Sequence, residues 1–255
     1  MVLLPLQDLG NALSAVGLVA SDVDGTLTRH EKFTPELLNA IAQLQQAKIQ
    51  LLLVTGRSAG WVDALRYYLP VTGAIAENGG LYYPALGPYQ LLSNIPDIGI
   101  HRQKLRSAFA MLKQQYPHLQ ESSDNAFRLT DWTFDVEGLS QTELGAIATQ
   151  CQQWGWSFTY STVQCHIKPA GQSKAQGIQQ VLRQQFPNIN LNQVLTIGDS
   201  PNDETMFDPA IFTVSVGVAN ILNYRTQIQH LPQFVTDRPG ADGFCELVAL
   251  LSKPR

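Results

Sequence analysis

The fold of this chain is constrained most by short apolar runs, each of which ends in a polar or glycine-bearing turn. The runs span residues 17–21, 50–54, 73–76 and 193–197. Residues 35–47, between the first two runs, carry apolar side chains at helical spacing, with Thr34 placed to cap that helix and Pro35 suited to its first turn. Strand–helix–strand alternation of this kind predicts an α/β fold with a doubly wound parallel sheet and right-handed crossovers.

The middle of the chain has a different pattern, which predicts a small α+β unit with an antiparallel sheet. Helical spacing covers residues 101–116 and 141–154, and alternation typical of strands covers 126–130, 132–137, 157–161 and 163–167. The parallel pattern then resumes with a helix at 174–186 and a closing helix after Gly243. We therefore expect a core domain formed by residues 1–86 and 169–255, with an α+β cap domain inserted at 87–168.

Charge and composition argue against several classes of function. The formal net charge is −4 and no run of Lys and Arg exceeds two residues, which is unlike a protein that binds nucleic acid or an anionic membrane. No apolar stretch approaches the roughly 20 residues of a membrane-spanning helix, and residues 1–16 fit a short amphipathic helix better than a signal peptide. Three scattered cysteines without a C-x-x-C spacing are typical of reduced thiols in a cytoplasmic protein.

Two carboxylates, Asp22 and Asp24, follow the first apolar run, and Gly25 allows a sharp turn away from it. Ligands bind at the carboxyl ends of strands in open α/β sheets, and side chains two residues apart point the same way along an extended chain. Asp22 could therefore attack an electrophile while Asp24 moves protons, and the pair invites a hard divalent cation. On these residues alone, the alternative is an ordinary Asp/Gly turn.

Three further motifs follow in the chain. Thr55-Gly56-Arg57 ends the second apolar run, Lys174 opens a helix after the segment 169–171, and the segment 198–203, which contains Asp199, ends the last run. In this order the motifs resemble those of the haloacid dehalogenase superfamily of phosphohydrolases. An insertion between the second and third motifs is similar to the C2-type α/β cap of one subclass, which includes the Cof-type sugar phosphatases and the sucrose-phosphate phosphatases. The resemblance implies a Rossmann-like core.

The resemblance also implies a role for each motif, and the chemistry of phosphoryl transfer accounts for these roles. Asp22 would be the nucleophile that forms an aspartyl-phosphate, and Asp24 would protonate the leaving alkoxide and then activate water. Mg²⁺ would be held by Asp22, the backbone carbonyl of Asp24, and Asp199. Thr55 and Lys174 would contact the phosphate. The other candidates would contact substrate or support the site: Gly56, Arg57, Asn78, Asn202, Asp203 and Asn220.

Some of these candidates keep a plainer interpretation. Arg57 could equally form a surface ion pair, and Asn78 could belong to a simple turn. The sequence before Asn220 is Val-Gly-Val-Ala, which departs from the Met-Gly-Asn-Ala of Cof-type proteins. Its role therefore stays open.

The alternation in the middle unit divides the expected cap sheet into two faces. One face would pack on the cap helices through Phe127, Leu129, Trp132, Phe134, Val136, Phe158, Tyr160, Cys165 and Ile167. The other face would carry Arg128, Thr130, Thr133, Asp135, Glu137, Gln164 and His166. We expect the polar face to close over the core and to bind a hydroxyl-rich ligand, and the alternative is an ordinary solvated sheet face.

The sequence therefore predicts a Mg²⁺-dependent phosphatase for a small phosphorylated metabolite: a sugar phosphate, a polyol phosphate or a phosphorylated hydroxy acid. Two rivals remain. A phosphomutase of the phosphomannomutase type would use the same carboxylates, and a non-catalytic binding protein could keep the same scaffold. The oligomeric state is left open, with a monomer as the simplest case.

Overall fold

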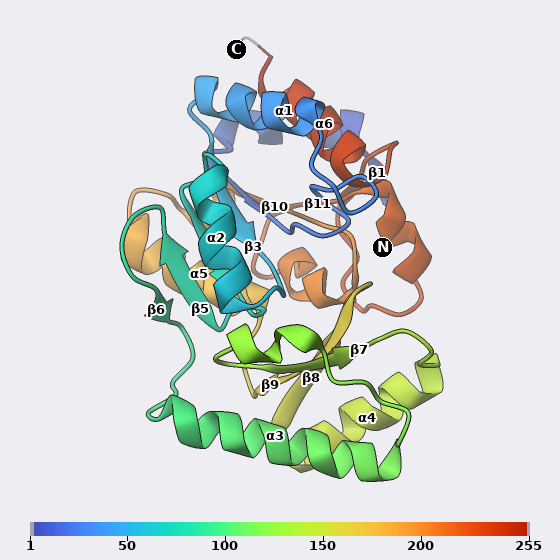
Figure 1. Cartoon of the computed structure of the whole chain (residues 1–255). Coiled ribbons are helices and arrows are strands. Elements are labelled where there is room, and N and C mark those ends of the chain that lie inside the picture. Colours follow the sequence, from blue (N-terminus) through green and yellow to red (C-terminus); the bar gives the residue numbers. More distant parts are fainter. Residues whose placement is uncertain (1–2, 254–255) are drawn as a thin grey trace.

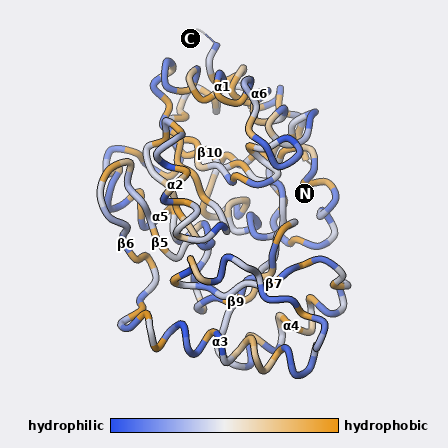
Figure 2. The backbone as a smooth tube through the Cα atoms, in the orientation of Figure 1, coloured by the Kyte–Doolittle hydropathy of each residue, from blue (hydrophilic) through white to orange (hydrophobic). Residues whose placement is uncertain are grey.

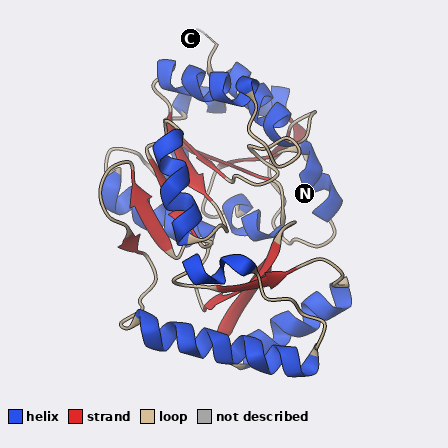
Figure 3. Ribbon diagram, in the orientation of Figure 1, coloured by secondary structure: helices blue, strands red, loops and turns tan. Residues whose placement is uncertain are grey.

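Two β-sheets organise the chain in the computed structural model, which describes residues 3–253 apart from the side chains of residues 11 and 12 (Figures 1 and 3). The larger sheet has the strand order β1-β12-β11-β10-β2-β3-β4-β5-β6, and its strands pair in parallel except where β5 meets β4 and β6. Its strands are β1 (Leu4–Pro5), β2 (Leu18–Ser21), β3 (Gln50–Val54), β4 (Gly73–Ala76), β5 (Leu81–Pro84), β6 (Gln90–Leu91), β10 (Val194–Gly198), β11 (Val214–Gly217) and β12 (Phe234–Val235). The predicted parallel core is thus confirmed.

Helices cover both faces of the larger sheet. One face packs against the 3₁₀ helix η1 (Leu6–Ala15) and against α1 (Pro35–Gln46), α2 (Ala59–Tyr68) and α6 (Gly240–Leu251). The other face packs against α5 (Lys174–Gln185) and the 3₁₀ helices η4 (Pro201–Phe207) and η5 (Ala219–Tyr224); the short η3 (Leu191–Gln193) precedes β10.

Burial on both faces explains why the central strands read as continuous apolar runs rather than as alternating ones. Val19 belongs to the cluster beneath α1, and its neighbour Leu18 belongs to the cluster beneath α5. Figure 2 shows hydrophobic residues along β10 and along α1 and α6. The predicted cap of α1 is confirmed, because the Thr34 hydroxyl accepts a hydrogen bond from Leu37 N at 3.2 Å.

The cap has its own antiparallel sheet, in the order β7-β9-β8. Its elements are α3 (Ile98–Gln115), the 3₁₀ helix η2 (Ser123–Phe127), β7 (Trp132–Asp135), α4 (Gln141–Gln153), β8 (Trp156–Tyr160) and β9 (Gln164–Pro169). In Figure 1 the helices α3 and α4 lie on the side of this sheet that faces away from the larger sheet. The fold class, a doubly wound core with an inserted α+β cap, is therefore confirmed. The division at residues 86/87 and 168/169 stays a prediction.

One expected cap strand is wrong. Residues 126–130 form the end of η2 and a loop, so the cap sheet has three strands among the described residues. The reason lies in the core, where the buried Glu77 carboxylate accepts the N–H groups of Leu129 and Thr130 that a sheet would otherwise use. Accordingly Phe127 is 62% exposed and Leu129 packs against the core cluster, not against the cap helices.

None of the helices in the described part of the chain is both long and apolar enough to cross a membrane.

Candidate active site

Three adjacent strands bring the predicted site residues together. Strand β2 lies between β10 and β3, and all three run parallel, so their carboxyl ends meet at one edge of the sheet. Asp22 follows β2, Thr55 follows β3 and Asp199 follows β10. Lys174 is the first residue of α5, whose N-terminus is capped by the Ser173 hydroxyl. Residues far apart in the sequence thus reach one small volume.

A buried lysine links two of the carboxylates. Lys174 Nζ donates to Asp22 Oδ1 and to Asp203 Oδ1, each at 2.6 Å. Burial raises the pKa of Asp22 to about 7, although Lys174 opposes this shift. Burial alone would lower the pKa of Lys174, but the charges of Asp203 and Asp22 raise it above its usual value. Lys174 therefore stays an ammonium group in contact with the candidate nucleophile.

The acidic cluster has the donor set of a site for a hard cation. Carboxylate oxygens of Asp22, Asp199 and Asp203 lie within 4.8 Å of one another. Asp203 is already engaged, because Lys174 occupies one oxygen and Asp199 N donates to the other at 2.8 Å. Asp22 Oδ2, by contrast, is buried and has no hydrogen-bond partner among the described residues. Asp22 and Asp199 thus fit the expected Mg²⁺ ligands, and Asp203 positions the lysine.

Asn220 holds the Asp199 carboxylate in place, and Gly25 leaves room for it. Asn220 Nδ2 donates to Asp199 Oδ2 at 2.6 Å and also lies 3.2 Å from the carbonyl oxygen of Gly25. Gly25 has φ = 81°, and a Cβ atom on it would lie 2.3 Å from Asp199 Oδ2. Only glycine fits there, for reasons of both backbone and space. Burial and the nearby Asp22 raise the pKa of Asp199 well above its usual range, which a bound cation would reverse.

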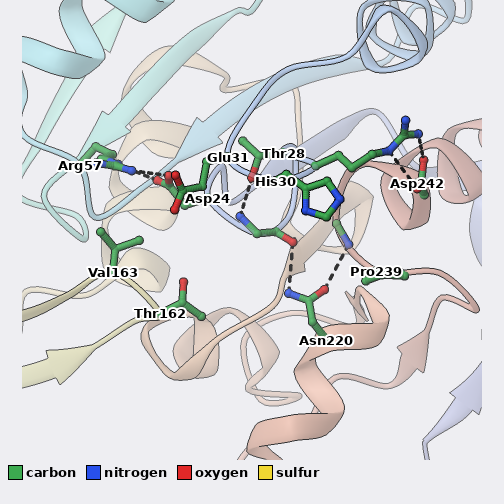
Figure 4. A pocket seen from close by; sticks show the side chains of 13 residues that line it. Asp24, Thr28, His30, Glu31, Arg57, Thr162, Val163, Asn220, Pro239 and Asp242 are labelled. Carbon is green, nitrogen blue, oxygen red and sulfur yellow. Dashed lines mark hydrogen bonds and ion pairs between the residues drawn. The ribbon is translucent and has the colours of Figure 1, made fainter. Parts of the chain in front are cut away.

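Asp24 makes a different contact. Arg57 Nε donates to Asp24 Oδ2 at 2.9 Å, and Arg57 Nη2 donates to Asp24 Oδ1 at 2.6 Å (Figure 4). The Asp24 side chain is 22% exposed, in contrast to the buried Asp22. The ion pair considered for Arg57 exists, and its partner is the residue expected to act as acid and base.

A small cavity, which we call the inner cavity, lies between the core and the cap. Its lining comprises Asp22, Asp24, Thr55, Gly56, Arg57, Ser161, Val163, Gln164, His166, Ser200 and Asn202. A Cβ atom on Gly56 would lie 3.1 Å from His166 Cε1 and 3.1 Å from Asn78 Nδ2. The absence of a side chain at residue 56 therefore lets His166 and Asn78 lie close to the backbone of this loop. Asn202 Nδ2 donates to Asn78 Oδ1 at 3.1 Å, while Asn78 Nδ2 is buried without a partner among the described residues.

Only part of the expected polar cap face reaches this cavity. Gln164 and His166 line it, whereas Asp135 is exposed and, like Glu137, is absent from the lining. Arg128 is buried and donates to Asp131, Asp124, Gln164 and, across the interface, the Gly56 carbonyl oxygen at 2.9 Å.

Glu77 and Asp131 are residues that the sequence analysis missed. Asp131 Oδ2 lies 2.8 Å from His166 Nδ1 and fixes the imidazole at the cavity wall. Burial lowers the pKa of His166, although Asp131 opposes this. The Glu77 carboxylate accepts hydrogen bonds from Thr130 N and Asp131 N, in the loop that carries Asp131. The one available signal was the position of Glu77 after β4, at the same edge of the sheet as the other site residues.

A second hollow, which we call the outer pocket, opens beyond Asp24 and has a volume of about 460 Å³. It lies between the turn after Gly25, the tip of the cap hairpin β8–β9 and the loop before α6 (Figure 4). Asp24, Arg57 and Val163 line both hollows. The Asp24–Arg57 pair therefore stands between them.

Comparisons with known proteins agree with this geometry. Phosphoglycolate phosphatases from Methanothrix thermoacetophila and Staphylothermus marinus are 25% and 24% identical to the chain, over 90% and 94% of its length and 94% and 99% of theirs. A solved structure from Thermoplasma acidophilum has the same fold, with a TM-score of 0.75 and 20% identity over 92% of this chain and 98% of that chain. A haloacid dehalogenase-like hydrolase from B. subtilis gives a TM-score of 0.71 and 16% identity over 92% and 99%. The family model of the haloacid dehalogenase-like hydrolases matches residues 19–126 and 100–244, and the chain belongs to this family.

Proposed function

We propose that the chain is a Mg²⁺-dependent phosphatase that hydrolyses a short phosphorylated hydroxy acid through an aspartyl-phosphate on Asp22. The observation that carries the proposal is that Asp22 Oδ2, beside the Lys174 ammonium group, is buried and has no hydrogen-bond partner in the described part of the chain. A carboxylate oxygen that is free, desolvated and close to a fixed positive charge is suited to attack a phosphorus atom.

The reaction takes two displacements. Asp22 forms a bond to phosphorus as the bond to the ester oxygen breaks, and Asp24 gives a proton to the leaving alkoxide. Water then attacks phosphorus, loses a proton to Asp24, and releases Asp22. Lys174 and the Thr55 hydroxyl hold phosphate oxygens in line for both steps. Asp22 and Asp199 would hold Mg²⁺, which would supply neutralisation of the charge on the nucleophile and the phosphate.

The relatives favour a short substrate. The curated relatives named above are phosphoglycolate phosphatases. We therefore propose a two- or three-carbon phosphorylated hydroxy acid ahead of the sugar and polyol phosphates. We also keep a cytoplasmic location as part of the proposal, because Cys151, Cys165 and Cys245 are free thiols.

The test is phosphate release from 2-phosphoglycolate, glucose 6-phosphate and mannose 1-phosphate, with Mg²⁺ and with excess EDTA. We expect release from phosphoglycolate only with Mg²⁺, and a loss of at least about 1,000-fold in kcat for Asp22→Asn. Asp8→Asn, an exposed carboxylate outside the site, is the matched control and should keep full activity. Full activity in Asp22→Asn would refute the mechanism. Isomer formation without phosphate release would instead identify a mutase, and no turnover of any ester would favour a binding protein.

A further inference from the structure

The contact between Arg57 and Asp24 poses a chemical problem for the proposed reaction. Both oxygens of the Asp24 carboxylate accept hydrogen bonds from the Arg57 guanidinium group. To protonate the leaving group, Asp24 must direct one oxygen at the ester oxygen of the substrate. In the observed pair, Arg57 takes the lone pair of each Asp24 oxygen that faces it, and only the outer, less basic lone pairs remain, so opening of the pair gives Asp24 a better geometry for proton transfer.

The position of the pair indicates what opens it. Asp24 and Arg57 line the inner cavity on one side and the outer pocket on the other. The inner cavity, at about 10 Å³, must widen to admit a phosphoryl group against Asp22, and the ester oxygen must then come within reach of Asp24. The rest of the leaving group therefore extends past Asp24, where the guanidinium group of Arg57 now lies.

Arg57 is the cation best placed to meet that leaving group. Three other basic side chains line the two hollows: Arg29 is paired with Asp242, His166 is bonded to Asp131, and His30 is exposed in the outer pocket, where it lacks the forked contact that Arg57 makes with Asp24. Arg57 is 27% exposed, and its guanidinium carbon lies 5.3 Å above the ring of Trp61, which supports it from the side. A planar guanidinium group binds any carboxylate in the same two-bonded geometry that it now makes with Asp24.

We propose that Arg57 exchanges Asp24 for the carboxylate of the leaving group, and so makes the enzyme selective for anionic leaving groups. This inference rests on the proposed phosphatase function. A carboxylate one or two carbons from the ester oxygen takes the guanidinium group, and the Asp24 side chain is released toward the ester oxygen. A neutral leaving group of the same size offers Arg57 no replacement for Asp24, so the pair opens at a greater cost in free energy. Selectivity therefore appears in kcat as well as in KM.

The experiment compares 2-phosphoglycolate with 2-hydroxyethyl phosphate, in which an alcohol replaces the carboxylate. For the wild type, we expect kcat/KM to favour phosphoglycolate by about 10- to 100-fold, the effect of one charge-assisted pair. Arg57→Gln should bring the ratio of the two kcat/KM values to within about threefold of one. Arg57→Lys keeps the positive charge but cannot make the planar, two-bonded contact of a guanidinium group, and it should give an intermediate ratio. Arg29→Gln, which changes another arginine of the outer pocket, is the control and should keep the wild-type ratio.

Different results would contradict the proposed exchange and the proposed phosphatase activity. If Arg57→Gln keeps the wild-type ratio, or if His166→Ala removes it while Arg57→Gln does not, the exchange is wrong. A wild-type ratio of one or less would also overturn it, while phosphate release from both esters would leave the phosphatase proposal standing. The phosphatase proposal itself fails only if neither ester is hydrolysed or if Asp22→Asn remains active. Equal thermal midpoints for the wild type and the Arg57 variants confirm that the ratio reports on a folded site.

Discussion

Removal of the Glu77 carboxylate should weaken the contact between the cap and the core and lower the free energy of unfolding. Glu77 is fully buried and lies in the left-handed region, with φ = 51°. Its oxygens accept hydrogen bonds from Thr130 N at 2.6 Å, Thr130 Oγ1 at 2.8 Å, Leu129 N at 3.0 Å, Asp131 N at 3.3 Å and Ala59 N at 2.9 Å. The first four donors belong to the cap and the last to the core, so one side chain joins two parts of the chain.

The magnitude follows from the donors left behind. Each buried donor without an acceptor costs about 1–3 kcal/mol, so five donors at the low end give about 5 kcal/mol for Glu77→Ala. Glu77→Gln keeps one oxygen and should cost about 2 kcal/mol. Urea unfolding at pH 7 measures both values. Glu36→Gln, whose side chain is 60% exposed, is the control and should change stability by less than about 0.5 kcal/mol. If Glu77→Ala lowers the free energy of unfolding by less than about 1 kcal/mol, the hydrogen bonds of Glu77 do not stabilise the contact between the cap and the core.

The remaining predictions concern the metal site and a buried lysine. Asn220→Ala removes a hydrogen bond to Asp199 and should raise the Mg²⁺ concentration for half-maximal activity by about 10- to 100-fold, measured by metal titration. Gly25→Ala should raise it further, because a Cβ atom would lie 2.3 Å from Asp199 Oδ2; unchanged Mg²⁺ dependence would contradict the assigned ligand. Burial lowers the pKa of Lys168 from 10.5 to about 8, so between these pH values the unfolded chain binds a proton that the folded chain lacks. The free energy of unfolding of the wild type, measured in urea relative to that of Lys168→Met, should therefore rise by about 3 kcal/mol from pH 7.5 to pH 10.5. A difference between the two proteins that does not change with pH would refute this.

The sequence predicts the meeting of distant motifs because parallel sheets impose it. Once residues 17–21, 50–54 and 193–197 are recognised as parallel strands, their carboxyl ends must share an edge, and Asp22, Thr55 and Asp199 follow from that rule alone. The prediction needs no side-chain contact.

Side-chain partners across the cap interface follow no such rule. The alternation of residues 126–130 matches a strand, yet Glu77 lies some fifty residues away and supplies the acceptors that turn this segment into a loop. Periodicity records which side chains are apolar, but it does not record where a backbone N–H finds its acceptor. The two-residue strands β1, β6 and β12 are too short to show any alternation.

The cap and the loop of residues 55–57 therefore form one polar network, and this limits how the proposed selectivity can change. Arg128 of the cap donates to the carbonyl oxygen of Gly56, directly before Arg57, and to the buried carboxylate of Asp131. Substitution of Arg128 would leave Asp131 without its main counter-charge and would release the loop that carries Arg57. Selectivity for the leaving group is therefore easier to alter at the tip of the cap hairpin, where Thr162 and Val163 line the outer pocket, than inside the buried network.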